Sequence, residues 1–131
     1  MRQEIIQKMK ETADYIFRHP ELSLKEYQSS RALAAFLEDE GFKVSWGLAG
    51  FETAFAAEWR STQGGDRAVG TLGIAGKPVI GFLAEYDALP GLGQECVPEQ
   101  KQNGEPGHGC GHNLLGTACA GAACELKERM Q

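Results

Sequence analysis

The order of apolar and polar positions predicts a helix near the start of the chain. Between residues 5 and 17 apolar side chains recur at every third or fourth position, and charged side chains fill much of the surface between them. Pro20 disfavours the helical conformation in the residue before it. We therefore expect an amphipathic helix that ends near His19, whose side chain caps the last carbonyls.

A second apolar stripe with helical spacing runs over residues 32–37. Ser23 and Glu26 have the spacing of a capping box, in which each side chain accepts a hydrogen bond from the other's backbone. This predicts that the second helix starts at Ser23. Gly41 is suited to end it in the left-handed conformation.

The central part of the chain has the patterns of strands. Residues 42–46 alternate apolar and polar side chains, and residues 53–59 are rich in apolar and aromatic ones. Residues 61–67 are polar and contain glycine, which predicts a hairpin loop leading to a partner strand at residues 69–74. Residues 78–84 form a nearly continuous apolar run, as in a strand covered on both faces, and should be central in the sheet.

A last helix is expected over residues 113–127, which are rich in Ala and Leu, with Asn113 as its cap. Helices and strands in this order predict an α/β fold with a central mixed sheet flanked by helices. The chain has 131 residues, 42% hydrophobic and 24% charged, which suits one globular domain.

The charge and hydropathy of the chain argue against two classes of binding partner, nucleic acids and membranes. The net charge of −5 comes without a cluster of Lys and Arg, which argues against nucleic acid. No apolar run approaches the roughly 20 residues of a membrane-spanning helix, and the first residues lack the apolar centre of a signal peptide. We expect a cytoplasmic protein with no membrane partner, whose four cysteines are thiols.

Residues with reactive side chains follow the predicted central strand. Glu85 and Asp87 stand at its carboxyl end, where open α/β sheets tend to place their sites. Residues 107–113 then hold two of the three histidines and a cysteine. Thiolate and imidazole are good ligands for zinc, and the flanking glycines let Cys110 and His112 converge on one ion. The same pair is also compatible with a purely structural loop.

Three segments together resemble a known family. They are residues 18–23 (RHPELS), 85–91 (EYDALPG) and 107–117 (GHGCGHNLLGT). In order and context they are similar to the opening third of the metal-dependent amidohydrolases and peptidases of hippurate hydrolase, indoleacetyl-amino-acid hydrolase and aminoacylase type. They look most like the p-aminobenzoyl-glutamate hydrolase branch.

The resemblance implies a pair of divalent metal ions, zinc or manganese, around one activated water. Cys110 would match the bridging or shared ligand and His112 a ligand to one ion. Asp87 matches the Asp that orients a metal-bound group through a hydrogen bond. Many relatives carry His two residues before that Asp, whereas this chain has Glu85, so the part that Glu85 plays toward the metal stays open.

The implied reaction is hydrolysis of the amide bond of N-acyl or N-aroyl amino acids or related dipeptide-like amides, by a full-length enzyme that can form a homodimer. The family's catalytic glutamate and remaining ligands follow later in the sequence than this chain extends. We therefore expect residues 1–131 to be a partial catalytic domain, without the rest of that domain and the dimerisation domain, and to turn over little or no substrate alone. Glu125 and Glu128 are expected to be solvated charges.

Two other interpretations remain. Cys96, His108, Cys110 and His112 have a number and spacing that permit one closed structural zinc site. Alternatively, the chain is a non-catalytic remnant that binds a complementary chain, in which case apolar surface should be exposed. Cys119 and Cys124 are expected to be small buried hydrophobes, and Cys96 an exposed thiol.

Overall fold

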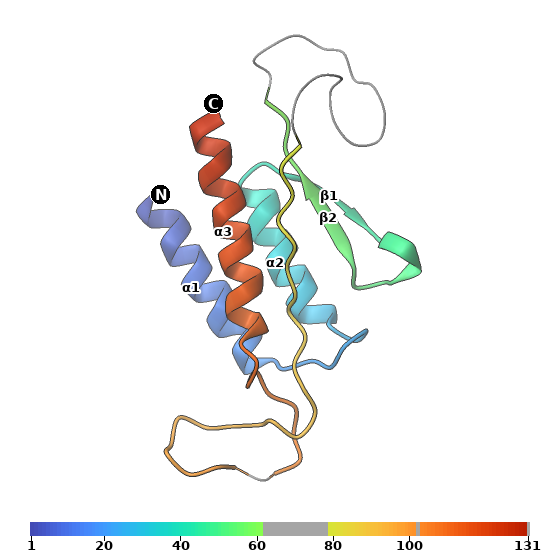
Figure 1. The fold of residues 1–131 in the computed structure, drawn as a ribbon, viewed down its shortest axis with the longest axis vertical. Helices are drawn as coiled ribbons and strands as arrows, with labels where there is room; N and C mark the ends of the chain where they lie inside the picture. The colour runs from blue at the N-terminus through green and yellow to red at the C-terminus, as the bar shows by residue number, and fades with distance from the viewer. Residues whose placement is uncertain (62–78, 102, 131) are drawn as a thin grey trace.

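The computed structural model describes residues 1–61, 79–101 and 103–130 (Figure 1). Three helices lie side by side, a short antiparallel hairpin lies beside the second of them, and both ends of the chain are at the same end of the helices. The mixed α/β class agrees with the prediction. The elements are α1 Gln3–Arg18, α2 Tyr27–Asp39, β1 Lys43–Trp46, the 3₁₀ turn η1 Leu48–Gly50, β2 Phe55–Glu58 and α3 His112–Met130.

The core lies where the three helices meet. Ile5 from α1, Leu33 and Phe36 from α2, and Cys124 from α3 are all buried in it. Burial of these apolar side chains is the main force that holds the helices together. The expectation of a buried cysteine is confirmed at Cys124, and burial raises the pKa of its thiol to about 11.

The end of α1 is as predicted, with His19 as the capping residue. The His19 Nδ1 atom donates to the Tyr15 carbonyl oxygen at 2.7 Å, so the histidine satisfies one of the helix's last carbonyls.

The predicted start of α2 was wrong, because the helix begins at Tyr27 and neither Ser23 nor Glu26 forms a capping box. Instead, the Glu21 carboxylate accepts hydrogen bonds from the backbone N–H groups of Gln28 and Ser29 at 2.8–3.0 Å. The Glu21 carboxylate, which precedes α2 in the chain, thus takes the place of the predicted Ser23 cap. It can do so because the unpaired N–H groups at the start of a helix carry partial positive charge and attract a carboxylate whichever part of the chain supplies it.

The end of α2 and the positions of the two strands after it agree with the prediction. Gly41 has a φ of 79°, and the Phe42 N–H donates to the Leu37 carbonyl at 3.0 Å, which closes the helix end. Strands β1 and β2 then pair antiparallel, with Lys43 opposite Glu58 and Trp46 opposite Phe55. The predicted loop and partner strand at 61–67 and 69–74 fall almost wholly on residues 62–78, outside the described residues.

The expectation that residues 78–84 form a central buried strand was wrong for their described part. Residues 79–84 belong to no strand, and Val79, Ile80 and Leu83 are 63%, 57% and 94% exposed. A strand covered on both faces needs sheet neighbours and a second layer. Among the described residues the only sheet is β1–β2, and this segment lies along α3 instead, where the thiol of the half-buried Cys119 donates to the Leu83 carbonyl.

Helix α3 begins one residue before the predicted start, and Asn113 is not its cap. The Asn113 side chain is buried, and its Nδ2 donates to the Ala13 carbonyl oxygen at 3.2 Å, which ties α3 to α1.

At the far end of α3, Glu125 forms an ion pair with Arg129, and Glu128 forms one with Arg2. The expectation that both glutamates are solvated charges was therefore wrong. Within the described part of the chain, no helix is both long and apolar enough to cross a bilayer.

Candidate metal centre

The segment that carries Asp87 is held by the backbone on both sides. The Ala88 N–H donates to the Glu21 carbonyl at 2.7 Å, and Leu89 and Gly107 exchange two backbone hydrogen bonds of 3.0 Å. A Cβ atom at Gly107 would lie 1.9 Å from the Leu92 carbonyl oxygen, so only glycine permits this approach. The two motif segments at 85–91 and 107–117 are therefore joined directly next to the candidate site.

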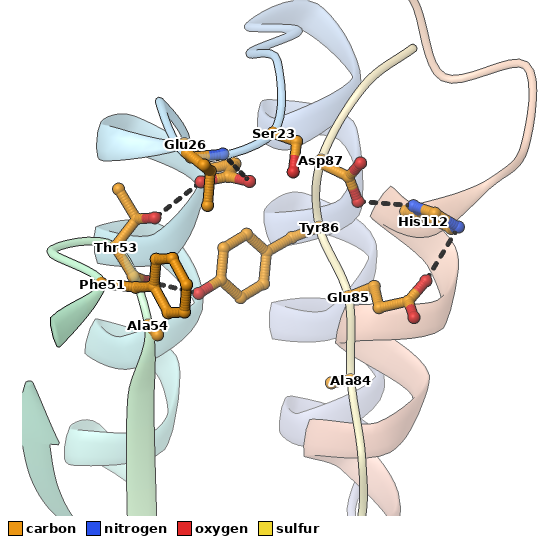
Figure 2. Close-up of a pocket in the computed structure, with 11 residues that line it drawn as sticks. Ser23, Glu26, Phe51, Thr53, Ala54, Ala84, Glu85, Tyr86, Asp87 and His112 are labelled. Carbon is orange, nitrogen blue, oxygen red and sulfur yellow. Dashed lines mark hydrogen bonds and ion pairs between the residues drawn. The ribbon is translucent and has the colours of Figure 1, made fainter. Parts of the chain in front are cut away.

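Side chains alternate across the extended segment, as they do along a strand. Figure 2 shows Glu85 and Asp87 directed toward His112 at the start of α3, while Tyr86 points to the opposite side, toward Thr53. Gly116, one helical turn after His112, permits the close approach of α3, because a Cβ there would lie 2.8 Å from the Glu85 carbonyl oxygen. The glycine of the last motif thus places His112 beside the carboxylates.

His112 lies between two carboxylates. Its Nδ1 is 2.7 Å from Asp87 Oδ1, and its Nε2 is 3.0 Å from Glu85 Oε2. The side chains of His112 and Asp87 are 16% and 21% exposed, whereas that of Glu85 is 63% exposed. The more buried contact is thus the one with Asp87, which fixes the orientation of the ring and directs Nε2 toward solvent and Glu85.

These residues suit a divalent metal ion. One ligand atom from each of Glu85, Asp87 and His112 lies within 4.8 Å of the others, and no second group of this kind occurs among the described residues. Carboxylate oxygen and imidazole nitrogen together are ligands for zinc and manganese. A histidine that donates one ring N–H to a carboxylate and presents its other nitrogen is the usual arrangement of a metal-bound histidine.

Cys110 does not belong to this group of ligand atoms. Its thiol is free and exposed, in the turn just before α3. His108 is buried near Phe17, with ring centroids 6.4 Å apart, and burial lowers the pKa of its imidazole. Cys96 is exposed, as expected. In the described residues Cys96, His108, Cys110 and His112 therefore do not come together as one closed zinc site.

A cavity of about 390 Å³ opens beside the three residues (Figure 2). Its apolar lining includes Leu24 and Phe51, both of which are half exposed or more. Leu24 has a φ of 68°, a left-handed conformation that costs energy for a residue with a side chain. His112 forms part of the lining of this cavity.

Glu26, Thr53 and Tyr86, which the sequence did not assign to the site, form the side of the cavity away from His112. Glu26 is buried and accepts hydrogen bonds from the Leu24 N–H at 2.8 Å and from the Thr53 hydroxyl at 2.6 Å. The Tyr86 hydroxyl donates to the Thr53 carbonyl oxygen, and burial raises the pKa of Tyr86 to about 12. The alternation of Glu85, Tyr86 and Asp87 could have placed Tyr86 on the opposite side, but no local pattern revealed its partner.

No family model matches this chain, but it is similar in sequence to several known proteins. It is 41% identical over 128 residues to a subunit of the p-aminobenzoyl-glutamate hydrolase of Escherichia coli (strain K12), covering 95% of this chain and 24% of that protein. It is 34% identical over 120 residues to the Xaa-Arg dipeptidase of Homo sapiens and 33% over 121 residues to that of Mus musculus, covering 88% of this chain and 23% of each relative.

The chain spans about a quarter of the length of these curated relatives. The match to the Escherichia coli protein covers 95% of this chain, which is enough to include all three motif segments. The resemblance inferred from the motifs is thus confirmed, because the chain is similar over most of its length to part of a p-aminobenzoyl-glutamate hydrolase subunit and of an Xaa-Arg dipeptidase.

Proposed function

We propose that this chain supplies part of the metal centre of an amidohydrolase that cleaves the amide bond of N-acyl or N-aroyl amino acids or related dipeptide-like amides. The names of its relatives support this class of small substrate. The reaction needs a carbonyl carbon made more electrophilic and a water made more nucleophilic. Bound zinc or manganese supplies both effects by polarising the carbonyl and lowering the pKa of a bound water.

The observation that carries the proposal is the hydrogen bond between Asp87 and His112. In the neutral tautomer whose Nδ1 donates to this carboxylate, the ring presents the lone pair of Nε2, beside Glu85, to a metal. Cys110, two residues earlier in an exposed turn, would supply a second ligand through its sulfur. The cavity beside His112 holds the substrate's amide near these groups.

In this proposal the chain alone turns over little or no substrate. The carboxylates near His112 in the described residues are Glu85 and Asp87, which contact its imidazole at 3.0 Å and 2.7 Å, and the proposal assigns neither of them as the base. A base and further ligands from elsewhere in the full-length enzyme would complete the site. A panel of acyl- and aroyl-amino acids with added manganese should therefore give no turnover. Clear turnover that Cys110→Ala abolishes would contradict this part of the proposal.

Metal content and affinity of the purified chain test the proposal directly. Wild type, Cys96→Ser, Cys110→Ser and His112→Ala are compared by elemental analysis and zinc titration. We expect weak binding that is retained in Cys96→Ser and lost in Cys110→Ser and His112→Ala. Tight binding of one zinc that is also lost in Cys96→Ser would instead establish the closed structural site.

A second candidate function, binding to a complementary chain, has one observation in its favour. Val79, Ile80, Phe82 and Leu83 form an exposed apolar segment with no strand partner among the described residues. Unpaired backbone and apolar side chains of this kind pair readily with another strand. Light scattering over a range of concentrations would detect association of the chain, and Leu83→Lys should weaken it. A monodisperse monomer with full solubility would argue against this candidate.

A further inference from the structure

We propose that the cavity beside the candidate metal centre binds the acyl end of the substrate, and that the side chains of Leu24 and Phe51 contact this end and select it. The inference rests on the proposed function and adds to it the orientation of the substrate. An N-acyl amino acid has an uncharged acyl group on one side of its amide and a carboxylate on the other. The lining of the cavity suits the first of these ends and not the second.

The cavity joins the candidate metal centre to an apolar surface. Its volume of about 390 Å³ lies near the lower limit of the range of about 300–1,000 Å³ that is usual for small-molecule sites. His112 lines the cavity, and so do Leu24 and Phe51. Figure 2 shows His112 and Phe51 at opposite ends of the lining, with Tyr86 between them. An acyl group whose carbonyl lies at His112 therefore extends within the cavity toward Phe51.

Leu24 and Phe51 offer an apolar ligand a favourable surface. They are 59% and 50% exposed, and neither belongs to the hydrophobic core of the three helices. The packing of the helices therefore does not depend on these two side chains. A ligand group that covers them removes apolar surface from water, which favours binding.

The backbone holds Leu24 in this exposed position at an energetic cost. Its φ of 68° lies in the left-handed region, which a residue with a side chain rarely adopts. The Leu24 N–H donates to the Glu26 carboxylate at 2.8 Å, and the Lys25 N–H donates to the Leu22 carbonyl at 3.0 Å, so the turn is fixed on both sides. Strained residues of this kind are concentrated at ligand-binding sites, and here the strained residue places an apolar side chain at the cavity.

The charge of the lining excludes the carboxylate end of the substrate. The carboxylates of Glu26, Glu85 and Asp87 line the cavity, and no Lys or Arg is among its described lining residues. A divalent metal at the centre would balance Glu85 and Asp87. Glu26 would keep its charge, since its partners among the described residues are the neutral Leu24 N–H and Thr53 hydroxyl. A substrate carboxylate is therefore repelled, whereas an uncharged acyl group is not.

Two probes of the same shape and different charge test this orientation. Benzamide has an aromatic ring and an uncharged amide, and benzoate has the same ring with a carboxylate. Each probe is titrated into the purified chain and its binding is followed by ligand-observed NMR, with a chelator present so that no metal ion binds the carboxylate. We expect benzamide to bind, and benzoate to bind at least about tenfold more weakly because like charges repel.

Phe51→Ala and Leu24→Gly test the two apolar side chains. Each should weaken benzamide binding by about threefold to tenfold, because a half-exposed side chain contributes only part of the free energy of full burial. Glycine adopts the left-handed conformation without strain, so Leu24→Gly removes the side chain and keeps the turn. Leu48→Ala is the matched control and should bind as wild type does. Leu48 is also exposed (42%), but it is not among the described lining residues.

Binding of neither probe, or binding of benzoate at least as tight as that of benzamide, would overturn the inference. Wild-type affinity in Phe51→Ala or in Leu24→Gly would remove that residue from the site. Circular dichroism shows whether each variant is folded, so a loss of binding is not mistaken for misfolding.

Zinc affinity of the same chain, measured without the chelator, tests the proposed metal centre separately. Benzamide binding by a chain that binds no zinc would contradict the metal dependence in the proposed function and leave the cavity as an acyl site. Zinc binding without benzamide binding would contradict the orientation alone.

Discussion

The Asp87 carboxylate accepts a hydrogen bond from His112 Nδ1 at 2.7 Å, although the two residues are 25 positions apart and lie on different elements. Asp87 follows an extended segment, and His112 is the first residue of α3. Two backbone contacts fix this relationship, the exchange of hydrogen bonds between Leu89 and Gly107 and the close approach of Gly116 to Glu85. The ring orientation of His112 is thus a property of the fold.

Substitution of Asp87 should weaken metal binding without unfolding the chain. In Asp87→Asn the amide can present its N–H₂ group to Nδ1, which favours the tautomer with the proton on Nε2 and blocks the metal-binding lone pair. We expect affinity for Zn²⁺ to fall by about tenfold to a hundredfold. Isothermal titration measures it. Asp14→Asn, an exposed substitution on α1 whose carboxylate pairs with Arg18, is the matched control and should leave affinity unchanged.

Gly116→Ala should displace the Glu85 segment from α3. The added Cβ would lie 2.8 Å from the Glu85 carbonyl oxygen, a rigid backbone atom. Overpacking of this kind costs about 1–3 kcal/mol, and the gain in helix propensity recovers at most about 1 kcal/mol. Urea denaturation should therefore show a lower free energy of unfolding, and zinc affinity should fall as well.

Gly121→Ala is the matched control on the same helix. Its Cβ would meet the Met9 side chain, whose flexible end can move aside. The free energy of unfolding should change less than in Gly116→Ala, and zinc affinity should not change. A loss of affinity in both variants would mean that the whole helix, and not the Gly116 contact, positions His112.

Glu26→Gln should lower stability although Glu26 lies outside the metal centre. Its carboxylate accepts hydrogen bonds from the Leu24 N–H and the Thr53 hydroxyl in a buried position, and an amide offers a single acceptor oxygen. One donor would be left without a partner, which costs about 1–3 kcal/mol. Thermal and urea unfolding measure the loss. Glu38→Gln, an exposed substitution on α2, should change stability by less than about 0.5 kcal/mol.

Cys124 should resist alkylation in the folded chain. Burial raises its pKa to about 11, so at a mildly alkaline pH it stays protonated, whereas the exposed thiols of Cys96 and Cys110 are free to react. Mass spectrometry after iodoacetamide should find Cys96 and Cys110 modified first and Cys124 modified only after unfolding. Early modification of Cys124 would mean that α3 opens from the core.

The same shift gives a pH dependence of stability. Because the thiol pKa is higher in the folded than in the unfolded chain, the folded state binds more protons between the two values. The stabilisation of the folded state by the protonated Cys124 thiol is full below pH 9.0, the ordinary pKa of a thiol, and is lost as the pH rises toward about 11. Cys124→Ala should remove this part of the alkaline decline in the free energy of unfolding, measured by urea titration at several pH values.

Local patterns in the sequence determined those helices and strands that depend on residues a few positions apart. The apolar stripes predicted α1 and α2, and Pro20 and Gly41 predicted their ends. Alternation predicted β1, and a stretch rich in apolar and aromatic residues predicted β2. Each depends on residues a few positions apart, so the physical reason can be read along the chain. The motifs likewise predicted a resemblance to p-aminobenzoyl-glutamate hydrolase, which the sequence similarity confirms.

Tertiary structure decided everything that depends on distant partners. Glu21, and not Ser23, caps α2; Asn113 joins α3 to α1; and the apolar residues 79–83 remain exposed because no sheet among the described residues covers them. The sequence named Asp87 and His112 separately, but only the packing of Gly116 and the pairing of Gly107 bring them to 2.7 Å, with Glu85 beside them. The sequence determines which side chains can act as ligands or hydrogen-bonding groups, whereas contacts between distant parts of the fold determine which of those side chains lie close together.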